Sequence, residues 1–208
     1  MRLSVSILNS KDKINMIKTL NNTKISYIHI DVMDGLFVSQ KSLSSDEIIK
    51  ISPFSSKSLD IHLMVENPMY YIERIKELPN IDNITIHLEI NKDIKNILNK
   101  IKEYGFKRSL AIKPNTDINL LVPYLDIIDR ILIMTVEPGL GGQPFLENSP
   151  NRIKEIKKLI KDKNIELEVD GGINNQTINK VKDVDISVVG SYITTSDNPA
   201  QRINDLLV

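Results

Sequence analysis

Two kinds of sequence pattern alternate along this chain. Short apolar runs rich in Ile and Val are followed by longer stretches in which Ile and Leu recur every three or four residues among Lys, Glu and Asn. The first pattern is typical of buried strands and the second of amphipathic helices. We expect strands near residues 3–8, 25–31, 58–64, 82–88, 106–112, 127–135, 165–170 and 185–190, and helices near residues 11–21, 44–51, 68–78, 92–104, 117–123, 148–163, 174–182 and 198–207. Eight strand–helix pairs in 208 residues predict an α/β fold with one domain over residues 1–208, a closed (β/α)8 barrel; an open doubly wound sheet is the alternative.

The composition narrows the classes of partner and ligand. Lys plus Arg and Asp plus Glu number 27 each, so no excess of positive charge indicates a nucleic-acid partner or an anionic membrane surface. No cysteine is present, which excludes thiolate ligands and is consistent with a cytoplasmic location. The apolar runs fall short of the ~18 residues of a membrane span, and the N-terminal run is too short for a signal peptide. Because the chain has no cysteine, any bound metal must use His, Asp or Glu.

Imidazole and carboxylate groups recur at the ends of three predicted strands. His29 and Asp31 are two residues apart, so on an extended strand both point to the same side. In a barrel the C-terminal strand ends meet at one face, which carries the active site. The candidate metal ligands at these ends are His29, Asp31, His62 and Asp170. Two imidazoles and two carboxylates suit zinc, manganese, iron or cobalt, whereas any one of these residues taken alone could be an ordinary hydrogen-bonded residue.

Other residues at predicted strand ends have weaker assignments. His87 and Glu89 are two residues apart at a predicted strand end, so their side chains point to the same side. We expect His87 to support the site or face a substrate rather than act as a fifth ligand. Three methionines, Met33, Met64 and Met134, lie beside the predicted site. They predict an apolar collar over it, with ordinary core packing as the alternative.

Glycine-rich segments follow the last three predicted strands. They are Gly139, Leu140, Gly141 and Gly142 after the sixth, Gly171 and Gly172 after the seventh, and Gly190 with Ser191 after the eighth. Glycine lets backbone amides approach an anion closely, and the loops after strands seven and eight commonly bind phosphate in such barrels. A phosphate site is therefore predicted at this face, with simple tight turns as the alternative.

Several sequence blocks, in order, resemble the ribulose-phosphate 3-epimerase family. They are Ser6-Ile7-Leu8, residues 29–35, 60–65, 134–145 and 168–173, and Val189-Gly190-Ser191. The resemblance implies a TIM barrel of the ribulose-phosphate-binding type, an isomerase that interconverts D-ribulose 5-phosphate and D-xylulose 5-phosphate in the pentose phosphate pathway. It further implies one divalent metal per subunit and a phosphorylated ketose as substrate, and we expect a cytoplasmic homo-oligomer.

The resemblance also implies roles for particular residues. By position, His29, Asp31, His62 and Asp170 match the metal ligands, Asp31 and Asp170 the acid–base pair, and Ser6, His62 and the glycine segments the substrate contacts. The chemistry agrees, because 3-epimerisation removes a proton from C3 and returns one to the opposite face. Two carboxylates can perform these transfers, and a metal can stabilise the enediolate.

Departures from the family pattern leave alternative functions open. Leu36-Phe37-Val38-Ser39-Gln40 stands where the family usually reads His-Phe-Val-Pro-Asn, and Asn9-Ser10-Lys11 where it reads Ser-Ala-Asp. The alternatives are 3-epimerisation of a ketohexose phosphate such as allulose 6-phosphate and a catalytically silent phosphosugar-binding barrel. A related decarboxylase or aldolase would carry Asp-x-Lys-x-x-Asp, but the same spacing here is His29-x-Asp31-x-x-Asp34, without the lysine.

Overall fold

The computed structural model describes residues 1–207, in which eight parallel strands close into a barrel in sequence order. The strands are β1 (Arg2–Ser6), β2 (Tyr27–Met33), β3 (Ser58–Met64), β4 (Ile81–His87), β5 (Lys107–Ile112), β6 (Arg130–Met134), β7 (Glu166–Asp170) and β8 (Ile186–Val189). Pairing of β1 with β8 completes the ring. The predicted closed (β/α)8 barrel is therefore confirmed, and the open sheet is wrong.

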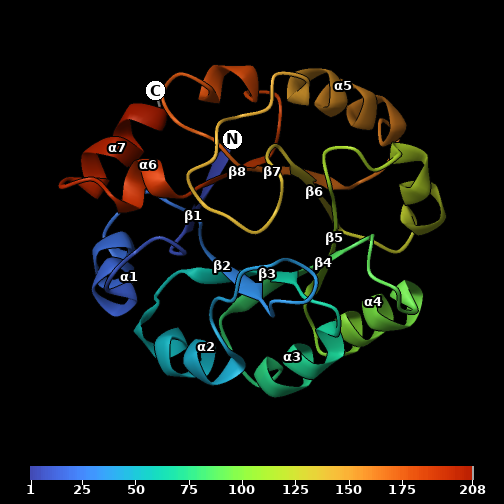
Figure 1. Cartoon of the computed structure of the whole chain (residues 1–208), viewed down its shortest axis with the longest axis horizontal. Coiled ribbons are helices and arrows are strands. Elements are labelled where there is room, and N and C mark those ends of the chain that lie inside the picture. Colours follow the sequence, from blue (N-terminus) through green and yellow to red (C-terminus); the bar gives the residue numbers. More distant parts are fainter. Residues whose placement is uncertain (208) are drawn as a thin grey trace.

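Helices form an outer ring around these strands (Figure 1). The α-helices are α1 (Lys13–Asn21), α2 (Ser45–Ile51), α3 (Pro68–Ile75), α4 (Ile94–Glu103), α5 (Ser149–Leu159), α6 (Ser191–Thr194) and α7 (Pro199–Leu206). Short 3-10 helices are η1 (Ser52–Phe54), η2 (Ile118–Tyr124) and η3 (Ile178–Lys180). Of the helices described, none combines the length and apolar character needed to cross a lipid bilayer.

Two helical segments differ from their predictions. The segment predicted at 117–123 is the 3-10 helix η2, and Pro123 inside it has no N–H for an α-helical hydrogen bond. The segment predicted at 174–182 contains only η3, because the Asn174 side chain accepts hydrogen bonds from the backbone N–H groups of Gln176 and Thr177. Such side-chain bonds stabilise a turn in competition with a helix.

The apolar core lies between the barrel and the helices, whereas polar groups occupy much of the barrel interior. Alternation along β2 places Ile28 and Ile30 in the apolar core and His29 and Asp31 on the opposite, inward side. Inward residues of other strands are also polar and fully buried, among them Ser4, Asp60, Asn83, Arg130 and Glu168. The fold therefore concentrates ionisable side chains inside the ring.

Candidate active site

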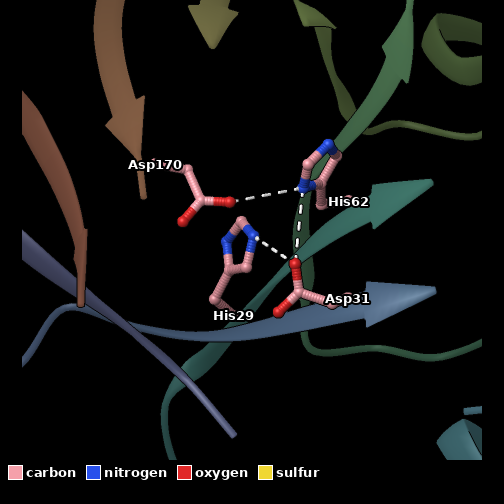
Figure 2. A group of neighbouring side chains, drawn as sticks. All are labelled: His29, Asp31, His62 and Asp170. Carbon is pink, nitrogen blue, oxygen red and sulfur yellow. Dashed lines mark ion pairs between the residues drawn. The ribbon is translucent and has the colours of Figure 1, made fainter. Parts of the chain in front are cut away.

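Four side chains from three strands converge inside the barrel (Figure 2). Strand β2 carries His29 and Asp31, β3 carries His62, and Asp170 is the last residue of β7. One ligand atom from each lies within 4.8 Å of the others. His29 Nε2 and His62 Nδ1 are each 3.5 Å from Asp31 Oδ1, and His62 Nδ1 is 3.7 Å from Asp170 Oδ2. The structure thus brings together all four residues predicted as metal ligands.

The inward-facing nitrogens of this cluster fit a divalent metal ion. His29 Nε2 and His62 Nδ1 are buried, and neither has a hydrogen-bond partner within residues 1–207. A buried polar atom without a partner is costly, and both nitrogens face the carboxylates. Two imidazole nitrogens and two carboxylate oxygens form a donor set that binds zinc, iron, manganese or cobalt. The cluster can therefore hold a metal, although the donors do not select one ion.

Hydrogen bonds from surrounding residues orient the cluster. His29 Nδ1 donates to Asp60 Oδ2 over 2.8 Å, so the opposite nitrogen of the ring points at the cluster. Ser6 Oγ donates to Asp31 Oδ2 over 2.6 Å. His87 lies outside the cluster and contacts His62, their Nε2 atoms being 2.9 Å apart. This is the position expected of a residue that supports the site without joining the ligand set.

The two carboxyl groups of the cluster have opposite shifts of pKa. Burial raises the pKa of Asp170 to about 6, and the negative charge of Asp31 acts in the same direction. Burial also disfavours ionisation of Asp31, but the imidazoles of His29 and His62 outweigh it and lower the pKa of Asp31 below its usual value. As the pH falls, Asp170 therefore takes up a proton before Asp31 does.

A cavity of about 400 Å³ opens above the cluster. The predicted residues that line it are Ser6, Asp31, Met33, Met64, Met134, Gly139, Leu140, Gly141, Gly142, Asp170, Gly171, Gly172, Gly190 and Ser191. His29 and His62 are fully buried beneath it. A single cavity therefore joins the two carboxylates, the methionines and every predicted glycine segment.

Loops after three strands meet around this cavity. A Cβ atom built on Gly142 would lie 3.7 Å from Ser191 Oγ, which places the loop after β6 beside the start of α6. A Cβ on Gly139 would lie 3.0 Å from the side chain of Val38, in the loop after β2. The loop after β6 crosses in front of the barrel in Figure 1, drawn in gold. The cavity is therefore walled by backbone-rich loops on one side and by the cluster on the other.

Comparison with known proteins identifies the family of this chain. The sequence profile of the ribulose-phosphate 3 epimerase family matches residues 2–194. The chain belongs to the ribulose-phosphate 3-epimerase family. The ribulose-phosphate 3-epimerase of Chlamydia pneumoniae is 34% identical over 197 residues, covering 92% of this chain and 86% of the relative. The ribulose-phosphate 3-epimerase of Helicobacter pylori strain 26695 is 34% identical over 212 residues, covering 99% of this chain and 96% of the relative.

Two solved structures share this fold at low sequence identity to this member of the epimerase family. A tryptophan synthase chain from Mycobacterium tuberculosis has a TM-score of 0.73 at 12% identity, covering 99% of this chain and 90% of the other. KGPDC from Streptococcus mutans has a TM-score of 0.70 at 15% identity, covering 99% of this chain and 95% of the other. At such identities the likeness supports the barrel fold alone.

Several residues at the site were not singled out from the sequence. The loop residues Asn174, Asn175 and Gln176 also line the cavity. Loop residues carry no periodic pattern, so their direction is not readable from spacing. Asp60 is different, because it precedes His62 by two residues and the shared parity could have placed it inside the barrel.

The close packing of the glycine loops gives a testable result for Gly172. Its φ is +68°, and an added Cβ would lie 2.4 Å from the backbone nitrogen of Phe145 in the loop after β6. Gly105 is a matched control, since its φ is +88° but no described atom lies within 4 Å of its added Cβ. We expect Gly105→Ala to cost about 1–2 kcal/mol of unfolding free energy and Gly172→Ala at least about 1 kcal/mol more, measured by urea unfolding. Equal losses would contradict the backbone clash.

Proposed function

We propose that this chain catalyses metal-dependent 3-epimerisation of D-ribulose 5-phosphate to D-xylulose 5-phosphate, a reaction of the pentose phosphate pathway, through an enediolate. The observation that carries the proposal is the convergence of two carboxylates and two unpartnered imidazole nitrogens, among the described residues, beneath a cavity walled by glycine loops. The names of the relatives support the substrate, since they are called ribulose-phosphate 3-epimerases.

The glycine segments are suited to hold the phosphate of the substrate. Gly172, Gly190 and Ser191 lie on the loops after β7 and β8, the usual phosphate grip of such barrels. Backbone amides at glycine positions can approach phosphate oxygens closely because no Cβ intervenes. A phosphate at this side would direct the sugar carbons toward Asp31 and Asp170 across the cavity. The methionine side chains would provide apolar contact beside them.

In this proposal Asp31 and Asp170 are the acid–base pair. They belong to β2 and β7, which β1 and β8 separate, so they approach the cavity from different sides. The ionised aspartate accepts the proton from C3, and the electrons of the C3–H bond form the enediolate. The other aspartate, which is protonated at the start, then donates its proton to C3 from the opposite face. The configuration at C3 is inverted, and the protein has no net gain or loss of protons. A metal held by the cluster would supply positive charge near the developing oxyanion.

The substrate test compares two ketose phosphates in deuterated water. We expect the purified protein to convert D-ribulose 5-phosphate to D-xylulose 5-phosphate and to introduce deuterium at C3. Proton NMR measures the exchange as loss of the C3 proton signal. Faster conversion of allulose 6-phosphate would favour the ketohexose alternative. Binding of both sugars without exchange at C3 would favour the silent barrel and contradict the proposal.

Metal removal should abolish activity reversibly. We expect the protein to contain one divalent ion per subunit by elemental analysis, and incubation with a chelator followed by dialysis to remove both the ion and the epimerisation. Adding back zinc, iron, manganese or cobalt ions one at a time should restore the rate and identify the preferred metal. A rate that survives complete removal of metal would contradict the metal requirement.

Two further expectations complete the proposal. The absence of cysteine agrees with a cytoplasmic location, which localisation of the tagged protein can test. The homo-oligomer stays a prediction, to be measured by light scattering.

A further inference from the structure

His87 connects the candidate metal centre to a carboxylate outside it. It is the last residue of β4 and is fully buried. Its Nε2 atom is 2.9 Å from His62 Nε2, and its Nδ1 atom is 3.1 Å from Glu89 Oε2. The two imidazole rings are nearly parallel, with an interplanar angle of 25°. Three side chains therefore form one hydrogen-bonded chain that ends at the ligand cluster.

The Glu89 end of this chain is rigidly held. Glu89 Oε1 accepts hydrogen bonds from the backbone N–H of Lys113, over 2.7 Å, and from the hydroxyl of Thr116. Above His87 lies the ring of Phe37, with centroids 4.7 Å apart, and Lys113 Nζ is 4.1 Å from the centroid of Phe37. The carboxylate of Glu89 is thus fixed as a hydrogen-bond acceptor, and the ring of Phe37 covers the imidazole of His87.

The direction of the hydrogen bonds follows from this anchor. An ionised carboxylate only accepts, so His87 carries a proton on Nδ1 and donates it to Glu89. In a neutral His87 the Nε2 atom is then an acceptor, and His62 must donate to it from Nε2. That tautomer leaves a lone pair on His62 Nδ1, the atom that faces Asp31 and Asp170. Figure 2 shows the two nitrogens of His62 on opposite sides of its ring, one toward the carboxylates and one away.

We propose that His87 and Glu89 are positioning residues that hold His62 in the tautomer able to bind a metal through Nδ1. The proposal rests on the proposed function, because it needs a metal at the cluster. The two imidazole ligands then differ in their outer partners. His29 donates directly to the carboxylate of Asp60, whereas His62 reaches its carboxylate through a second imidazole. Outer partners of this kind commonly change metal affinity by 10–100-fold when removed.

The first test measures metal affinity in a series of variants. His87→Leu removes the acceptor, and we expect it to raise the dissociation constant for Zn²⁺ by about 10–100-fold, measured by chelator competition. His87→Gln keeps a carbonyl acceptor for His62 and should recover part of the affinity. Thr85→Val is the matched control, since Thr85 is buried on the same strand two residues earlier and does not contact His62 or His87 through a hydrogen bond in residues 1–207. Its affinity should equal that of the wild type.

The second test observes the tautomer itself, without reference to activity. The chain has 3 histidines, so ¹⁵N NMR of histidine-labelled protein can resolve each ring. We expect His62 to carry its proton on Nε2 in the wild type and to show a mixture of tautomers in His87→Leu. Glu89→Gln, at a partly exposed position, should shift the same signals and provides the test if His87→Leu does not fold.

The outcomes separate this inference from the function on which it rests. A wild-type protein that binds no divalent ion would contradict the proposed metal-dependent function. A wild type that binds one ion, together with a His87→Leu variant of unchanged affinity and unchanged His62 tautomer, would overturn the role of His87 alone. Loss of affinity in Thr85→Val equal to that in His87→Leu would also overturn it, because the effect would then be one of strand packing.

Discussion

The Asp170→Asn variant is expected to epimerise D-ribulose 5-phosphate about 10²–10⁴-fold more slowly than the wild type, the range typical of losing a general acid or base. Asparagine has nearly the same shape as aspartate but cannot exchange a proton with C3. Asp170 lies at the cavity wall with a 17% exposed side chain, so the substitution disturbs little packing. Initial rates should be measured at saturating substrate with metal supplied, and circular dichroism should match the wild type.

Isotope exchange makes this experiment sharper. If each aspartate removes the C3 proton of one epimer, Asp170→Asn should still exchange deuterium into one pentulose phosphate, through Asp31, and fail with the other. Asp31→Asn should show the reverse preference. Glu137→Gln serves as the control, since Glu137 also lines the cavity but lies outside the cluster. Full epimerisation by Asp170→Asn would contradict the paired mechanism.

The sequence predicted the barrel well because the strand and helix patterns have different periods. The predicted strand at 58–64 has the observed bounds of β3, whose alternate apolar residues face the helices. The segment 174–182 shows where spacing alone misleads. Ile178 and Val181 are spaced as on a helix and are buried, but Asn174 stabilises a turn before them. Hydrogen bonds from side chains to the backbone compete locally with helix formation, and the spacing of apolar residues does not reveal them.

The site could be predicted in part for the same reason. The parity of His29 with Asp31 follows from the two-residue repeat of a strand, and barrel closure then brings Asp170 to them. The hydrogen-bond partners of these residues were harder to predict. Arg130 on β6 reaches Asp60 on β3 across 70 residues of sequence, and this pairing depends on how side chains fill the barrel. No local pattern encodes such a contact.

Arg130 contacts three carboxyl groups at the base of the barrel. Its guanidinium is fully buried and lies 3.2 Å from Asp60 Oδ1, 3.2 Å from Glu168 Oε2 and 3.0 Å from Glu166 Oε2. Burial raises the pKa of Glu168 well above its usual value, and the nearby Asp60 acts in the same direction, whereas Arg130 opposes them. Asp60 in turn accepts the hydrogen bond that orients His29. The charge of Arg130 therefore supports both the barrel and the cluster above it.

Removing this charge should destabilise the protein more than any surface substitution. We expect Arg130→Met to lower the free energy of unfolding by about 3–5 kcal/mol, because it leaves buried carboxylates without their cation. Arg130→Lys keeps the charge but not the planar fork, so its loss should be smaller. The control is Arg108→Met, which breaks an ion pair with the 39% exposed carboxylate of Asp129 and should cost about 1 kcal/mol or less. Urea unfolding of the variants measures the differences, and equal losses in Arg130→Met and Arg108→Met would show that burial of the carboxylates does not set the cost.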